Sequence, residues 1–267
     1  MLQSMVSERA SRRFLFCISA SLFAASAAVT IAWCASMSAM GEMPMPGGWT
    51  MSMAWLRMCG QTWPNAAGSF IGMWVAMMAA MMLPSLTPML WRYRQVVGRT
   101  GDPSSGWLTA LAGAGYFFVW AVSGVVAFVL GSALAALEMQ WPALARSVPV
   151  ATGVVVLIAG ALQLTSWKAR HLACCRDVSV CDRAMRVDAA TAWGHGLRLG
   201  LHCSTCCAGL TAILLVMGVM DLRVMAAVTA AITAERLAPA GERVARATGA
   251  AVVVLGLILI VRAMGLG

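Results

Sequence analysis

The sequence contains few charged residues. Only 11% of its 267 residues are Asp, Glu, Lys or Arg, compared with about a quarter in soluble domains. Hydrophobic residues make up 61%, and the mean hydropathy is +0.81. This composition excludes a water-soluble core and indicates a polytopic membrane protein. The net charge of +9 then reflects topology, so we expect no nucleic-acid partner, although basic loops could contact anionic lipid.

The motifs of several enzyme classes are also missing. The sequence has no glycine-rich phosphate-binding loop, no Ser-His-Asp order typical of hydrolases and no long acidic tract. It therefore favours binding or transfer over catalysis, while leaving open whether the chain is an enzyme. No ATP-driven module is visible, so a bound substrate would move passively, with another gradient, or by transfer to a partner.

Seven apolar segments are candidates for membrane spans, because a span needs about 20 predominantly apolar residues. They are 14–35, 68–91, 107–135, 148–167, 196–220, 223–238 and 245–266. The sixth is short and carries Glu235 near its end. We therefore predict an all-α, polytopic transmembrane helical bundle of about seven helices, forming a single membrane domain over 1–267.

The orientation of the bundle follows from Lys and Arg, which are enriched in cytoplasmic loops. With the N-terminus inside, four of the 19 lie outside and the other 15 lie on the cytoplasmic side. The four are Arg57, Arg146, Arg223 and Arg262. We predict an N-in, C-out protein of the bacterial inner membrane. The first segment could instead be a signal peptide, but its apolar stretch of about 20 residues exceeds the 7–15 typical of one.

A cluster of candidate metal ligands lies within the fifth apolar segment. Cys203, Cys206 and Cys207 are three or four residues apart and share a helical face, and His202 lies a turn before Cys206. Ionisable side chains are costly inside a bilayer and therefore indicate function. Thiolate and imidazole groups bind soft and borderline metals. We predict a metal-binding or redox role, with passive packing of small Cys side chains as the alternative.

Methionine is abundant, with 21 residues, and the second apolar segment carries a stripe of them. Met77 and Met81 are four residues apart, as are Met78 and Met82. This spacing alone favours packing, because Met fills irregular gaps. Thioethers also select Cu(I), and the nearby Cys cluster makes metal binding the favoured interpretation. We expect Pro84 to break or kink this helix.

The predicted external loop, 36–66, is rich in methionine. Its seven Met residues are Met37, Met40, Met43, Met45, Met51, Met53 and Met58. They could close around one soft ion or lie in the membrane interface. Cys34 and Cys59 flank the loop and could form a disulfide, since that compartment permits one.

The predicted cytoplasmic loop, 168–194, offers a second set of ligands. It holds His171, Cys174, Cys175 and Cys181. These four could complete a structural zinc site, which needs four ligands, or the segment could simply be a solvated basic loop. Farther along, Glu235 could pair with Arg236 or Arg243 at the membrane boundary, or act as a counter-charge near the Cys cluster.

Several of these segments resemble a bacterial family of predicted metal-binding integral membrane proteins of unknown function. The matching elements are the Met-rich span 73–84, then Gln163 to Lys168, Cys175 and Arg176, the Gly200, Cys203, Cys206 and Cys207 element, Gly218 with Met220, Met225, and Glu235 to Gly241. The resemblance covers about residues 68–260. This chain has Thr205 and Ala208 where the family usually has Gly and Trp, and His171 where a Cys is expected. The resemblance implies a metal-binding membrane protein.

We therefore expect a membrane protein that binds a soft metal ion, Cu(I) above other soft or borderline metals. The ion would pass between the external loop, the second-span Met residues and the Cys cluster. The role would be transport, or delivery to a copper enzyme with a metallochaperone or metalloenzyme as partner. The first rival is a membrane thiol–disulfide carrier using the Cys203 and Cys206 pair. The second is a structural subunit whose Cys and Met residues only pack.

Overall fold

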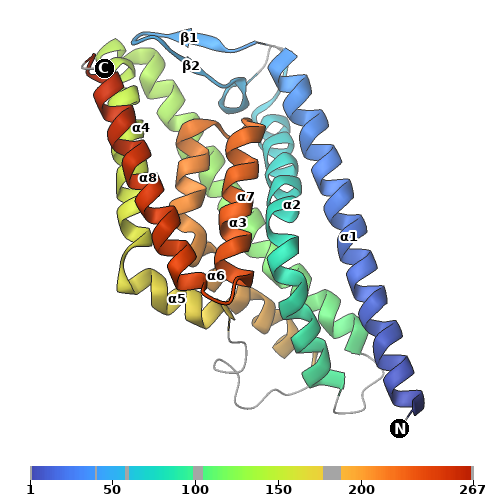
Figure 1. Cartoon of the computed structure of the whole chain (residues 1–267). Coiled ribbons are helices and arrows are strands. Elements are labelled where there is room, and N and C mark those ends of the chain that lie inside the picture. Colours follow the sequence, from blue (N-terminus) through green and yellow to red (C-terminus); the bar gives the residue numbers. More distant parts are fainter. Residues whose placement is uncertain (1, 40, 58–59, 99–104, 177–187, 266–267) are drawn as a thin grey trace.

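A computed structural model describes residues 2–39, 41–57, 60–98, 105–176 and 188–265 and shows a helical bundle (Figure 1). The described α-helices are α1 (Leu2–Ala39), α2 (Trp63–Gly98), α3 (Ser105–Gln140), α4 (Pro142–Gln163), α5 (Ser166–Arg176), α6 (Ala189–Gly218), α7 (Leu222–Leu237) and α8 (Gly241–Ala263). A hairpin of β1 (Met43–Met45) and β2 (Trp49–Met51) and a 3-10 helix, η1 (Met53–Trp55), lie between α1 and α2. The predicted all-α helical bundle is confirmed.

Within the described residues, six helices rather than seven are long and apolar enough to cross a membrane: α1, α2, α3, α4, α6 and α8. The difference is α7, which covers the sixth predicted span, 223–238. It has 16 residues and is therefore about 24 Å long at 1.5 Å per residue, less than the roughly 30 Å of a hydrocarbon core. Even so, α7 lies among the long helices (Figure 1). The start of α1 and the end of α8 lie at opposite ends of the bundle, and the N-in, C-out orientation stays a prediction.

The helices α3 and α6 approach each other closely because glycines line their contact. A Cβ at Gly115 would lie 2.7 Å from the Trp193 carbonyl oxygen, and a Cβ at Gly196 would clash with the Ala112 carbonyl. Small residues allow this backbone approach where no hydrophobic driving force holds helices together. The close contact brings Tyr116 of α3 against the middle of α6.

The helix α2 runs unbroken from Trp63 to Gly98 with Pro84 and Pro88 inside it. Of the predicted break or kink at Pro84, the break is therefore absent. Between the prolines, Ser85 Oγ donates to the Met82 carbonyl at 3.0 Å and Thr87 Oγ1 to the Leu83 carbonyl at 2.8 Å. Both hydroxyl groups thus bond to carbonyl groups of their own helix. Ser85 is 0% exposed and lies in the interior of the bundle.

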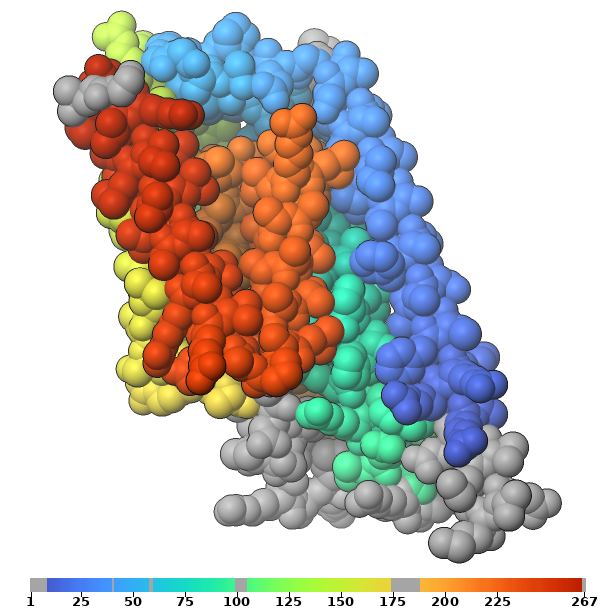
Figure 2. All heavy atoms as spheres, in the orientation of Figure 1, coloured from blue at the N-terminus to red at the C-terminus, as the bar shows by residue number. Residues whose placement is uncertain are grey.

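The two segments predicted as loops contain regular structure. In 36–66, the hairpin lies across one end of the bundle (Figure 2), where Met45 and Met51 pack against Ala135 and Ala145. Apolar packing therefore orders part of this Met-rich segment. In 168–194, α5 occupies the beginning and α6 starts at Ala189. Residues 177–187, which include the candidate ligand Cys181, lie outside the described residues.

Candidate metal centre

The three cysteines of α6 are buried and form two environments. Asp188 caps the helix, its carboxylate accepting from the Thr191 N–H at 2.7 Å. Cys203, Cys206 and Cys207 are 1%, 3% and 2% exposed. Cys207 contacts both other thiols, but Cys206 packs into a separate apolar cluster with Met89, Leu172 and Ala245. The predicted shared face therefore holds for Cys203 and Cys207, with Cys206 at its edge.

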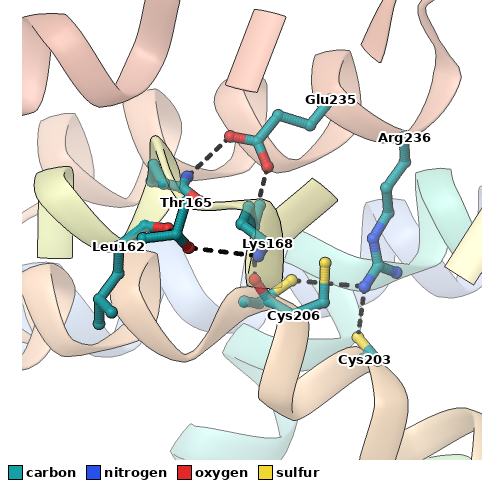
Figure 3. A network of polar contacts seen from close by, with 9 residues as sticks. Leu162, Thr165, Lys168, Cys203, Cys206, Glu235 and Arg236 are labelled. Atoms are coloured by element: carbon teal, nitrogen blue, oxygen red, sulfur yellow. Dashed lines mark hydrogen bonds and ion pairs between the residues drawn. The ribbon is translucent and has the colours of Figure 1, made fainter. Parts of the chain in front are cut away.

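A buried arginine joins Cys203 and Cys207. Arg236 extends from α7, and its Nη2 atom lies 2.9 Å from Cys203 Sγ and 3.4 Å from Cys207 Sγ (Figure 3). Its Nη1 atom donates to Ser85 Oγ at 3.3 Å. Because a buried charge is costly unless it is paired and hydrogen-bonded, these contacts favour negative charge on the sulfur pair.

Two further side chains complete this group. The Tyr116 hydroxyl lies 2.8 Å from Cys203 Sγ, and Met82 Sδ lies 3.8 Å from the same sulfur atom. Helices α2, α3, α6 and α7 thus converge on Cys203. We call the group of Cys203, Cys207, Met82, Tyr116 and Arg236 the thiol centre.

A buried ion pair lies beside the thiol centre. Glu235 Oε2 lies 2.8 Å from Lys168 Nζ, and Gln163 Nε2 donates to Glu235 Oε1 at 2.8 Å. Lys168 also donates to the Cys206 carbonyl oxygen at 2.8 Å. Burial lowers the pKa of Lys168, but negative charge on Cys206 and on the Glu235 carboxylate outweighs burial and raises that pKa above its usual value.

The predicted pairing of Glu235 with Arg236 or Arg243 is wrong. Consecutive residues on a helix point about 100° apart, so Glu235 faces α5 while Arg236 faces α6 (Figure 3). The partner of Glu235 is Lys168. The other interpretation, a charge close to the Cys cluster, agrees with the link from Glu235 through Lys168 to Cys206.

The predicted methionine ligands face the interior of the bundle. Met77, Met78, Met81 and Met82 are all buried, and they belong to one apolar cluster with Cys203 and Cys207. Of the four, Met82 lies against the cysteines, with its Sδ atom 3.8 Å from Cys203 Sγ. The stripe therefore leads to the thiol centre.

The remaining candidate ligands are His202, His171 and Cys175. His202 is half-buried on α6. The His171 Nδ1 atom lies 3.0 Å from the Trp167 carbonyl oxygen of its own helix, and its ring packs on the Trp167 ring at a centroid distance of 4.2 Å. Cys175 falls within α5, but its side chain lies outside the described part of the structure.

Sequence reasoning missed Tyr116, Ser85 and the thiol contacts of Arg236. A signal was present for two of them. Tyr116 is one of only two Tyr residues, and Arg236 lies in an apolar helix, where a charge indicates function. The sequence did not predict how α7 is rotated about its own axis. That rotation directs Glu235 toward Lys168 and Arg236 toward the cysteines.

The donor atoms of the thiol centre suit a soft ion. Two thiols and a thioether form an all-sulfur set of the kind that selects Cu(I). In the described parts of the chain, no group of three or more His, Cys, Asp or Glu side chains is arranged to hold a metal. Of the four ligands considered for a zinc site, Cys174, Cys175 and Cys181 have side chains outside the described part of the structure, so that site stays a prediction. Hard cations have no oxygen cage at the thiol centre.

Fold and centre together define a helical bundle with buried soft-metal donors, and comparison with known families agrees. The sequence profile of the PpoB2 family, described as a copper chaperone, matches residues 71–259. This chain belongs to that copper chaperone family. The match includes the Met stripe, the three α6 cysteines and Arg236. No curated protein and no solved structure matches the chain.

Proposed function

We propose that this protein is a multi-pass membrane copper chaperone that holds Cu(I) at the thiol centre and hands it to a copper-enzyme or metallochaperone partner. The observation that carries the proposal is the pair of buried thiols, one helical turn apart, that share a single guanidinium nitrogen. The family match supports the copper specificity.

Charge balance explains why an arginine belongs in such a site. One Cu(I) ion bound by two thiolates carries a net charge of −1, which is costly in a low-dielectric interior. The Arg236 charge makes the ensemble neutral. Met82, 3.8 Å from Cys203 Sγ, supplies a neutral third donor, and Cys206 supplies a thiol on the adjoining turn.

The ion would reach this centre along the buried methionines and leave past α5. Met77, Met78, Met81 and Met82 extend along α2 toward Cys203. On the other side, α5 packs Leu172 against Cys206 and carries His171 and Cys175 as candidate accepting ligands. His202 would assist on α6. Such a route serves delivery to an enzyme and transport equally.

We propose that this route lies in the bacterial inner membrane, with the N-terminus inside. The six long apolar helices support it, as does the distribution of Lys and Arg. Cysteine labelling in intact cells should modify Cys59 from outside and Cys181 only after the membrane is opened. Labelling of Cys59 from the cytoplasmic side alone would reverse the proposed orientation.

The thiol–disulfide carrier is less well supported than copper binding. Exchange requires an accessible, reactive thiol, whereas Cys203 and Cys206 are 1% and 3% exposed. A redox carrier also gives no role to the Met stripe that leads to the thiols.

Copper content of the full-length protein, purified in detergent under reducing conditions, tests the proposal. The variant Cys203→Ser/Cys206→Ser/Cys207→Ser should lose most of its bound Cu(I). Single variants refine the result: Cys203→Ser and Cys207→Ser should each lose more copper than Cys206→Ser, because the Arg236 guanidinium contacts Cys203 and Cys207. Unchanged copper stoichiometry in the folded triple variant would reject the proposal and leave packing as the role of these residues.

A further inference from the structure

A pocket lies at the hairpin end of the bundle, away from the thiol centre. It has a volume of about 60 Å³, and its lining includes Met37, Met53, Met73 and Met220. These come from α1, η1, α2 and the turn between α6 and α7, respectively. Tertiary folding, rather than a repeated spacing in one segment, therefore brings the four thioethers to one place.

Methionine is over-represented in this lining. The pocket has 11 lining residues, and at the average frequency of 21 Met in 267 residues, these positions would hold about one Met. Four are present, together with Trp33 and Phe70. The hairpin residues Met45 and Met51 are buried elsewhere, against α3 and α4. Only some of the nearby methionines therefore line the pocket.

The burial of the four residues forms a gradient. Met37, Met53 and Met220 are half-buried, whereas Met73 is fully buried. Behind the pocket, Cys34 is 2% exposed, and its Sγ lies 4.0 Å from Met220 Sδ. Cys34 and Met73 belong to the same buried cluster as Met77, Met81 and Cys203. Sulfur donors thus continue from the pocket into the interior.

We propose that Met37, Met53, Met73 and Met220 form an outer Cu(I) loading site, the thioether pocket, with Cys34 as the next donor inward. Thioethers are soft, neutral ligands that select Cu(I). A site without thiolate charge binds the ion less tightly than the thiol centre and releases it more readily. The onward transfer rests on the proposed function, but binding in the pocket does not.

The test uses full-length protein, titrated with Cu(I) under reducing conditions against a competing chelator. In the background Cys203→Ser/Cys207→Ser, the thiol centre is removed, and one weakly bound Cu(I) ion per chain should remain. X-ray absorption should show that ion with sulfur neighbours. Adding Met37→Leu/Met53→Leu/Met220→Leu should abolish it. The matched control is Met139→Leu/Met264→Leu, which changes two exposed methionines and should leave it in place.

The outcomes separate the two proposals. No residual ion in the Cys background, or a residual ion that survives the three pocket changes, overturns the thioether pocket and leaves the thiol centre standing. If the Cys changes remove no copper while the pocket changes do, the thioether pocket stands and the proposed function fails. Circular dichroism and thermal unfolding in detergent confirm that each variant is folded before its copper is counted.

Discussion

The two sulfur-rich regions of this protein differ in the charge around their sulfur atoms and in how fully their side chains are buried. In the thiol centre, Cys203 and Cys207 are buried, and both contact a guanidinium that Ser85 also holds. In the thioether pocket, the donors are neutral and three of the four are half-buried. Directional, charge-assisted contacts favour tight holding, whereas flexible thioethers favour rapid exchange. In the proposed function a copper chaperone uses both properties, and the two regions would supply one each.

The two buried cations beside the thiols differ in their partners. Lys168 pairs with a carboxylate at 2.8 Å, so its charge is satisfied whether or not metal is bound. Arg236 contacts two sulfur atoms that are themselves candidate ligands. We therefore assign Lys168 to stability and Arg236 to the charge balance of the bound ion, an assignment that the following substitutions test.

Lys168→Met should have the largest effect on stability. It leaves the Glu235 carboxylate buried without a cation, which costs about 3–5 kcal/mol. Thermal unfolding in detergent should show the loss. The double variant Lys168→Met/Glu235→Gln should recover most of it, because no charge is then left unpaired. A single variant as stable as the wild type would show that the pair does not hold α5 against α7.

Arg236→Gln should weaken copper binding strongly while changing the fold less. A hydrogen bond to a charged group contributes about 1.5–3 kcal/mol, which corresponds to roughly a 10- to 150-fold loss of affinity. Competition with a Cu(I) chelator measures it. Arg236→Lys keeps the charge but loses the planar fork, and should fall between Arg236→Gln and the wild type. Equal affinities in all three proteins would remove Arg236 from the charge balance.

The sequence was sufficient to predict the helical class, because long apolar runs determine it. It also predicted the Met face of α2 and the approach of Cys203 and Cys207, since both follow from helical periodicity. The sixth segment, 223–238, matches α7 to within one residue at each end. What differed was the number of spans, because so short a helix is not long enough to cross a hydrocarbon core. The Lys168–Glu235 pair and the thiol contacts of Arg236 depend on how α5 and α7 rotate against α6, and periodicity within one helix does not determine that rotation. The methionines of the thioether pocket come from four separate segments. Periodicity within one helix does not show that they meet, so the sequence did not predict the pocket.

The smallest expected effect on stability per substituted residue comes from the Met stripe, which also gives the closest test of a connection between the two regions. Met77, Met78, Met81 and Met82 are all buried, and volume-conserving Met-to-Leu changes usually cost under about 1.5 kcal/mol each. If these thioethers carry the ion, the four-Leu variant should stay folded but accumulate less cellular copper and support less copper-enzyme activity.

Met89→Leu is the matched control for the four-Leu variant. Met89 is buried on the same helix but packs in the cluster of Cys206 rather than along the stripe, so its change should leave copper handling intact. Wild-type copper accumulation and enzyme activity in the four-Leu variant would reduce the stripe to packing. The thiol centre would then have to receive its ion by another path, because no sulfur atom of α2 would remain between Met73 and the position of Met82. Met73 lies nine residues before Met82, which is about 14 Å along a helix and too far for direct transfer between two sulfur ligands.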